Sequence, residues 1–191
     1  MLDVHPFFGK NVPAQKHDHE DSLKGLTFRY EVLPRDVEDV RGLVEKTGFF
    51  RVDEISVAAE LVAERLNRGP ESGYYFVMAE EEGRLAGYVC YGPIPCTVSS
   101  YDLYWIAVDP MLQGKGLGKA LLYEAERLIR DMGGDRVYVE TSSREQYDST
   151  RIFYERCGYM LASVLDDFYG PGDSKTTFLK VLRGGEQPAP Q

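Results

Sequence analysis

The sequence predicts an α+β fold in a single domain. Apolar runs of strand length recur along the chain, and about four segments between them place apolar residues at three- and four-residue steps, the spacing of one buried helical face. A glycine-rich turn joins one of these runs directly to one of these helices. The 191 residues suffice for one domain with a full core, and no internal linker divides them.

The first half of the chain predicts one strand, two helices and a hairpin. Residues 26–32 alternate as a strand. Helices are expected over residues 36–46, where Asp36 can serve as the cap, and over residues 52–67. Two further apolar runs, residues 74–79 and 85–90, predict a hairpin whose turn is formed by Glu82 and Gly83.

The second half predicts the central strand, two more helices and three more strands. In order, these are expected at residues 101–108 (strand), 117–132 (helix), 137–141 (strand), 150–156 (helix), 159–165 (strand) and 176–181 (strand), with a loop over residues 166–173. Residues 1–24 and 184–191 show no periodicity and are predicted to be flexible tails of a domain at residues 25–183.

Composition and charge exclude several classes of function. The net charge of −9 argues against nucleic acid or an anionic membrane as a partner. We find no apolar run of membrane-spanning length and no secretory leader. Three cysteines without metal-type spacing suggest reduced thiols and a cytoplasmic protein. His17 and His19 lack a carboxylate or cysteine companion, so no metal site is predicted.

The central motif is the glycine-rich turn. Asp109 and Pro110 end the central strand, and Gly114, Gly116 and Gly118 then lead into a helix. Such a turn gathers free N–H groups at the positive end of a helix, which favours a phosphate or pyrophosphate ligand. A nucleotide P-loop would need Ser or Thr after the lysine, and a dinucleotide fingerprint would need glycine at position 119. Neither pattern fits.

Two sequence blocks resemble one family. The first is Gln113-x-x-Gly116-x-Gly118, preceded by Val108-Asp-Pro and followed by Leu-Leu. It is similar to the acetyl-coenzyme A pyrophosphate loop of the GNAT N-acetyltransferases. The second block, residues 149–159, resembles the short GNAT helix that ends in Phe-Tyr-Glu-Lys/Arg-x-Gly-Phe/Tyr. The order of elements also matches that family. The resemblance implies an α/β/α layered fold around a mixed, mostly antiparallel sheet of about seven strands with about four helices.

The resemblance implies a binding site for acetyl-coenzyme A as the acyl donor. Its expected contacts are Ile106, Ala107, Val108, Gln113, Gly114, Lys115, Gly116, Leu117, Gly118, Lys119, Ser149 and Tyr154. It also implies a bulge in the central strand near Ile106 and Ala107, where one backbone N–H would polarise the thioester carbonyl. Many members carry an asparagine where this chain has Tyr147, which puts one of the coenzyme A contacts in doubt.

The implied reaction is direct attack by an amine. Tyr154 matches the family's tyrosine that protonates the departing thiolate, and thiols and phenols have reference pKa values close enough for this role. Glu140 is our first choice as the general base, with Asp102 and Glu54 as the other candidates. A covalent route through a cysteine is rejected because no histidine outside the tail could activate the thiol.

The acceptor is expected to be a primary amine of a small molecule. In the family, the early helices and the last loop shape the acceptor groove. Here those segments, residues 49–54 and 166–169, are aromatic and acidic, which suits a cationic amine. A free amino acid would also need a partner for its carboxylate, and Arg51, Arg144 and Lys175 are available for this.

Two alternatives to this function are carried forward. The phrases at residues 102–108 and 140–147 resemble a bacterial subgroup labelled D-alanine N-acetyltransferase, whereas the segment after Asp167 is similar to enzymes that acetylate protein N-termini. An acetyltransferase for peptide N-termini or side chains is therefore one alternative. A non-catalytic module that binds acyl-coenzyme A is the other. A monomer or homodimer is expected.

Overall fold

The computed structural model describes residues 23–182. Over that range the chain forms four α-helices and one seven-stranded sheet with strand order β1-β2-β3-β4-β5-β7-β6. Neighbouring strands run antiparallel except β4 and β5, which are parallel. This confirms the predicted α+β class and the mixed, mostly antiparallel sheet. The predicted tails lie outside the described residues, except for Leu23 and Lys24, and so do His17 and His19.

The element bounds agree with the predicted order. The strands are Leu26–Arg29 (β1), Tyr75–Glu81 (β2), Arg84–Pro93 (β3), Ser100–Val108 (β4), Arg136–Ser142 (β5), Met160–Gly170 (β6) and Asp173–Val181 (β7). The helices are Asp36–Thr47 (α2), Val52–Arg68 (α3), Leu117–Asp131 (α4) and Asp148–Arg156 (α5). The tight hairpin turn was correctly predicted: Glu82 and Gly83 both have positive φ, as a type I′ turn requires.

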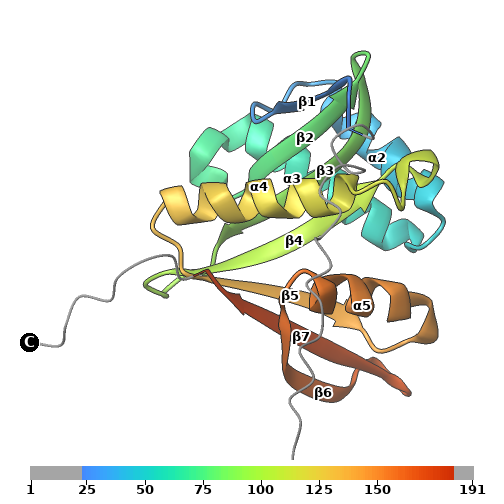
Figure 1. Ribbon diagram of the computed structural model, residues 1–191, viewed down its shortest axis with the longest axis vertical. Coiled ribbons are helices and arrows are strands. Elements are labelled where there is room, and N and C mark those ends of the chain that lie inside the picture. The colour runs from blue at the N-terminus through green and yellow to red at the C-terminus, as the bar shows by residue number, and fades with distance from the viewer. Residues whose placement is uncertain (1–22, 183–191) are drawn as a thin grey trace, which may run out of the picture.

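The helices form a layer on each side of the sheet (Figure 1). On one side, α4 and α5 bury Leu117, Leu121 and Tyr154 against a core that spans β2 to β7. On the other side, α2 and α3 pack on β2, β3 and β4 only. In the half-sheet β5-β7-β6, α5 therefore covers one face of β5 and β7, the opposite face is left open by the described helices, and β6 is exposed along its length. That open face adjoins the functional site.

The last hairpin is longer than the sequence predicted. Residues 166–173 were expected to form a loop, whereas β6 continues to Gly170 and β7 begins at Asp173. Pairing is irregular between Leu165 and Gly170, and Asp167 lies there with φ 53°. Its Oδ1 accepts a hydrogen bond of 2.7 Å from the Gly172 N–H. Two consecutive aspartates are typical of a turn, but long-range pairing with β7 outweighs that local preference.

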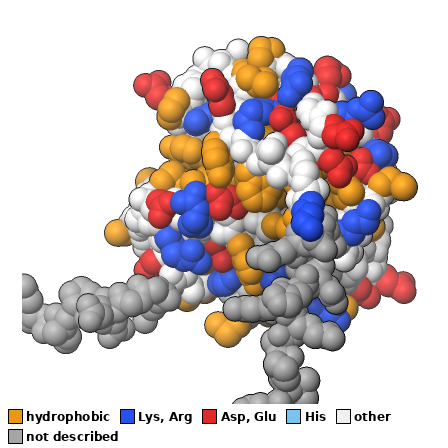
Figure 2. Space-filling model, turned by 45° about the horizontal axis from the view of Figure 1, so that its top comes forward, with side chains coloured by type: hydrophobic (Ala, Val, Ile, Leu, Met, Phe, Trp, Pro, Cys, Tyr) orange, Lys and Arg blue, Asp and Glu red, His pale blue; other side chains and the backbone are white. Residues whose placement is uncertain are grey.

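The surface mixes charges of both signs. On the face shown in Figure 2, acidic and basic side chains are interspersed, and apolar side chains gather between them. The net charge of −9 is thus not matched by a single acidic patch on that face. Over residues 23–182, none of the helices combines the length and the apolar character needed to cross a membrane.

Candidate active site

The sheet opens between its two parallel strands. β4 pairs with β5 only where Ser100–Leu103 face Arg136–Val139, and beyond this point β5 continues to pair with β7 alone. Figure 1 shows the two strands diverging toward the end of β4. Backbone groups of residues 104–108 on that side of β4 consequently have no strand partner in β5. They offer a row of donors and acceptors to an extended ligand, and Ile106, Ala107 and Val108 belong to this row.

The glycine-rich loop lies at the end of β4. Gly114 and Gly116 have φ of 75° and 91°, which lets the chain turn sharply into α4. The buried Leu117 anchors the first turn of the helix, while Gln113, Gly114 and Lys115 are exposed. The Gln113 side chain donates a hydrogen bond of 3.3 Å to the Val108 carbonyl. This hydrogen bond connects the loop to the end of β4, the strand whose unpaired edge forms part of the candidate site.

The loop helix packs directly on α5. A Cβ placed on Gly118 would lie 3.7 Å from the Phe153 ring, so the two helices approach closely at the start of α4. This contact brings Ser149 and Tyr154 of α5 to the same side of the sheet as the glycine-rich loop. The residues predicted to contact acetyl-coenzyme A thus come from three segments that are separated in the sequence, namely β4, the glycine-rich loop and α5.

Tyr154 is a buried residue at the centre of an aromatic cluster. Only 4% of its surface is exposed, and its ring centroid lies 5.6 Å from that of Tyr159 and 6.2 Å from that of Phe178. Burial raises the pKa of the Tyr154 hydroxyl, with a smaller contribution from Cys157. The hydroxyl is therefore protonated across the physiological pH range, and the raised pKa favours donation of a hydrogen bond to a thiolate over complete proton transfer.

The bulge in β4 lies earlier than predicted. It was expected near Ile106 and Ala107, but Leu103 pairs with Tyr91 and Trp105 pairs with Cys90, so Tyr104 is the extra residue. A bulge places two consecutive side chains on one face of a strand. Here Tyr104 and Trp105 both pack on the α2–α3 side. Nothing in the local sequence predicts this position, because a bulge is defined by the pairing with β3.

Two carboxylates lie on the sheet face opposite Tyr154. Asp102 and Glu140 are direct sequence neighbours of Leu103 and Val139, which are buried under α4 and α5. Because successive side chains of a strand face opposite sides of the sheet, the two carboxylates point away from α4 and α5. Asp102 is half-buried. Burial raises its pKa to about 6, helped by the negative charge of Glu140 and opposed by Lys175. Glu140 accepts a hydrogen bond of 3.0 Å from the Lys175 ammonium.

Several aromatic rings lie on the same side of the sheet as these carboxylates. The Tyr104 and Tyr74 ring centroids lie 5.3 Å apart, and those of Trp105 and Phe50 lie 5.1 Å apart. The indole N–H of Trp105 is buried without a hydrogen-bond partner among the described residues. Across the opening, the pKa of Tyr169 is raised mainly by burial and also by Glu140, Asp173 and Glu54, so these groups are near neighbours. Sequence reasoning missed Tyr104 and Trp105 because the bulge decides where they point.

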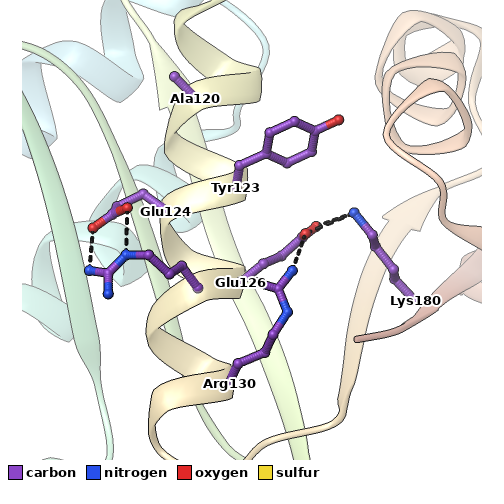
Figure 3. Close-up of a pocket in the computed structure, with 7 residues that line it drawn as sticks. Ala120, Tyr123, Glu124, Glu126, Arg130 and Lys180 are labelled. Atoms are coloured by element: carbon purple, nitrogen blue, oxygen red, sulfur yellow. Dashed lines mark hydrogen bonds and ion pairs between the residues drawn. The ribbon is translucent and has the colours of Figure 1, made fainter. Parts of the chain in front are cut away.

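A separate surface cavity of about 530 Å³ lies on the outer side of α4. Figure 3 shows that its charged side chains pair with one another: Glu124 with Arg127, and Glu126 with Arg130 and Lys180. The Lys180 ammonium also donates a hydrogen bond of 2.8 Å to the Cys157 carbonyl at the end of α5. These contacts join α4, α5 and β7, so the cavity marks a structural junction. Among the described residues, no three metal-ligating side chains are placed to share an ion.

Comparison with known proteins now decides the family. A model described as the acetyltransferase (GNAT) family matches residues 42–159. The chain belongs to the GNAT family of acetyltransferases. A solved structure from Desulfovibrio desulfuricans, described as a GNAT-family acetyltransferase, has 48% sequence identity and a TM-score of 0.82, covering 83% of this chain and 99% of that one. The predicted family and enzyme class are thereby confirmed.

More distant GNAT proteins share parts of the chain. The uncharacterized N-acetyltransferase YvbK of Bacillus subtilis strain 168 is 32% identical over 58% of this chain, and the match covers 65% of its own length. The chain thus spans less than two thirds of that relative. The structure of an aminoglycoside 6′-N-acetyltransferase complexed with coenzyme A has 17% identity and a TM-score of 0.67, and it covers 85% of this chain and 99% of that one. At this identity the likeness concerns the fold. The acyl donor of the GNAT family is acetyl-coenzyme A.

Proposed function

We propose that the protein transfers the acetyl group of acetyl-coenzyme A to a primary amine of a small cationic molecule by direct attack. The observation that carries this proposal is the opening between β4 and β5, with the glycine-rich loop on one face of the sheet and the carboxylates of Asp102 and Glu140 on the other. Donor and acceptor would approach the opening from opposite faces.

The donor side is built from backbone groups. The N–H groups of the loop from Gln113 to Lys119 lie at the positive end of α4 and suit a pyrophosphate. The unpaired edge of β4 at Ile106, Ala107 and Val108 suits the amide groups of the pantetheine arm, and one N–H there would polarise the thioester carbonyl. Ser149 lies exposed in the first turn of α5 and supplies a hydroxyl in place of the usual asparagine contact.

Two groups handle protons. As the amine nitrogen bonds to the acetyl carbon and the carbon–sulfur bond breaks, Tyr154 donates a proton or a hydrogen bond to the departing thiolate. The acceptor ammonium first gives one proton to the carboxylate pair of Asp102 and Glu140, directly or through water. Once the nitrogen has bonded to the acetyl carbon it loses a second proton as the amide forms, and this proton replaces, through solvent, the one that Tyr154 gives to the thiolate. Glu140 remains our predicted base. Asp102 is its partner and, unlike Glu140, carries no ion pair within the described residues, while its pKa of about 6 suits proton acceptance near neutral pH.

Release of free coenzyme A thiol, measured across a panel of amines and short peptides, tests the proposal. Turnover with a small amine, and its loss in the double variant Asp102→Asn with Glu140→Gln, are expected. Preference for peptides would replace the small-molecule acceptor by the peptide alternative. If the protein binds coenzyme A but no acceptor gives turnover, the non-catalytic binding module is the correct description.

Location and assembly belong to the same proposal. We place the protein in the cytoplasm, in keeping with three cysteines that form no disulfide in the described chain. A monomer or a homodimer accords with a site whose proposed parts all come from one chain. Analytical ultracentrifugation at micromolar concentration separates these two states, and a larger assembly would contradict both.

A further inference from the structure

The basic side chains on the acceptor side decide whether a free amino acid could bind there. An α-amino acid presents its carboxylate next to the reacting amine, so the site would need a cation to receive it. Arg51, Arg144 and Lys175 are the candidates from the sequence. In the structure each of them already has a carboxylate partner.

Arg144 is held by a nearly buried acid. Its Nε lies 2.9 Å from Oδ2 of Asp173, whose side chain is only 5% exposed. Asp173 also accepts a hydrogen bond from the Ser142 hydroxyl. Transferring Arg144 to a substrate carboxylate would leave the buried Asp173 charge without its cation, which is strongly unfavourable.

Lys175 is held twice. Its Nζ lies 3.0 Å from Oε1 of Glu140 and 4.3 Å from the centroid of the Phe168 ring, and only 15% of its side chain is exposed. A cation that contacts both a carboxylate and an aromatic face would lose two favourable interactions if it moved to a substrate carboxylate. Because the Lys175 side chain is largely buried, little of its surface is accessible to a second anion.

Arg51 and the start of α3 are occupied locally. The guanidinium makes two hydrogen bonds to Asp53, of 3.2 and 3.1 Å. Glu54 accepts a 2.8 Å hydrogen bond from the Arg51 backbone N–H, so the chain's own carboxylate already fills the N-terminal end of the helix. With 59% of its side chain exposed, Arg51 is the most easily released of the three cations.

The groups left for recognition favour a cation alone. Asp102 has no ion pair within the described chain, the Tyr104 hydroxyl lies close enough for Asp102 to raise its pKa, and Tyr169 is in the same relation to Glu140. Carboxylates and π faces together attract an ammonium and repel an anion. We propose, on the basis of the function proposed above, that the acceptor is a small primary amine that bears no carboxylate beside the amine, and that free amino acids are excluded.

Pairs of acceptors that differ only in that carboxylate test the proposal. We would measure kcat/KM with acetyl-coenzyme A for ethylamine against D- and L-alanine, 2-phenylethylamine against phenylalanine, and tyramine against tyrosine. The expected result is at least a tenfold preference for the amine in every pair that reacts. Equal or higher kcat/KM for an amino acid overturns this inference and leaves the proposed function intact. No turnover with any member, despite coenzyme A binding, overturns both.

Freeing the cations one at a time tests the cause. Asp53→Asn weakens both hydrogen bonds of the Arg51 guanidinium, leaves only the Glu54 carboxylate at 3.8 Å from Nε as a charged partner, and should not affect folding because the contact is local and exposed. Asp173→Asn releases Arg144. We expect each change to narrow the preference for the amine by several-fold, because a cation becomes available to the amino acid carboxylate. The matched control is Glu64→Gln, which frees Arg68 at the C-terminal end of α3 from its carboxylate partner and should leave the preference unchanged. An unchanged preference in both test variants contradicts exclusion by these ion pairs.

Discussion

At the residue scale, Tyr154 and Tyr159 form a natural pair for comparison. Their rings lie in one buried cluster, but only Tyr154 is proposed to reach the reacting sulfur, and the buried Tyr159 hydroxyl has no hydrogen-bond partner within residues 23–182. We expect Tyr154→Phe to lower kcat about 100-fold and to leave the KM for acetyl-coenzyme A nearly unchanged, as for loss of a general acid. Tyr159→Phe should keep kcat within about twofold. Steady-state kinetics on both variants distinguish a proton donor from a packing residue, and a wild-type rate in Tyr154→Phe would refute the donor.

Asp102 links activity to stability through its pKa. Because the folded-state pKa of Asp102 is about 6, above its ordinary value of 3.8, the folded form binds the proton more tightly than the unfolded form. Asp102 therefore costs stability as the pH rises through this window, and the cost is complete above pH 6. Because Asp102 is half-exposed, we expect Asp102→Asn to raise the free energy of unfolding by about 1 kcal/mol at pH 7 and to leave it unchanged near pH 4. Urea denaturation at both pH values measures this.

The same titration predicts the acidic limb of the rate. The carboxylate must be ionised to accept a proton and to attract an ammonium, so kcat/KM should rise with pH up to about 6 and then level off with respect to this group. The neighbouring charges of Glu140 and Lys175 enter the same titration. In Asp102→Asn the limb near pH 6 should disappear. A limb that persists unchanged would assign it to another group.

At the scale of elements, the role of the glycine-rich loop in binding coenzyme A can be distinguished from the effect of backbone strain. Gly116 and Gly133 have φ of 91° and 85°, at the start and just after the end of α4. An aspartate at either position meets the same left-handed backbone and adds the same charge. We expect Gly116→Asp to weaken coenzyme A binding at least tenfold and Gly133→Asp to leave it unchanged, measured by calorimetry. Equal affinities in the two variants would remove the loop from the site.

The junction of α4, α5 and β7 depends on one buried ion pair. The Lys180 ammonium lies 2.8 Å from both Glu126 oxygens, and Glu126 is only 2% exposed. Lys180→Met should destabilise the fold by about 3 kcal/mol because it leaves the buried Glu126 carboxylate with only the longer, 3.6 Å contact to Arg130. Adding Glu126→Gln should recover part of this. By comparison, Arg127→Met breaks an exposed pair and should cost about 1 kcal/mol or less. Chemical denaturation of all three variants measures the difference.

What the sequence could predict depended on the range of the interactions. The Glu82–Gly83 turn and the glycine-rich entry to α4 follow from local backbone preferences, and the helices from their periodicity. The bulge at Tyr104 and the irregular end of β6 depend on pairing with another strand, so the family resemblance misplaced the first and local patterns misplaced the second. Likewise, Arg144 could be recognised from the sequence as a cation, but its commitment to Asp173 is set by contact across 29 positions.

At the scale of the whole molecule, the two halves of the sheet are joined by a short stretch of parallel pairing between β4 and β5. A ligand that pairs with the free edge of β4 should complete the junction. We expect saturating acetyl-coenzyme A, at about 100 times Kd, to stabilise the protein by about 2.7 kcal/mol. Amide hydrogen exchange should slow at residues 104–108 and 113–118. Slowing confined to α2 and α3 would contradict the proposed binding mode.

The bulge in β4 has a practical consequence for spectroscopy. It turns Trp105, the one tryptophan of the chain, toward the acceptor side and sets its ring against Phe50. Indole emission is sensitive to the polarity around the ring, and the tryptophan fluorescence of this protein comes from Trp105 alone. We expect occupation of the acceptor side of the sheet to change the intensity or wavelength of intrinsic fluorescence, which can be recorded in the unlabelled protein on the stopped-flow timescale. Acceptors that are not acetylated can be ranked in the same way.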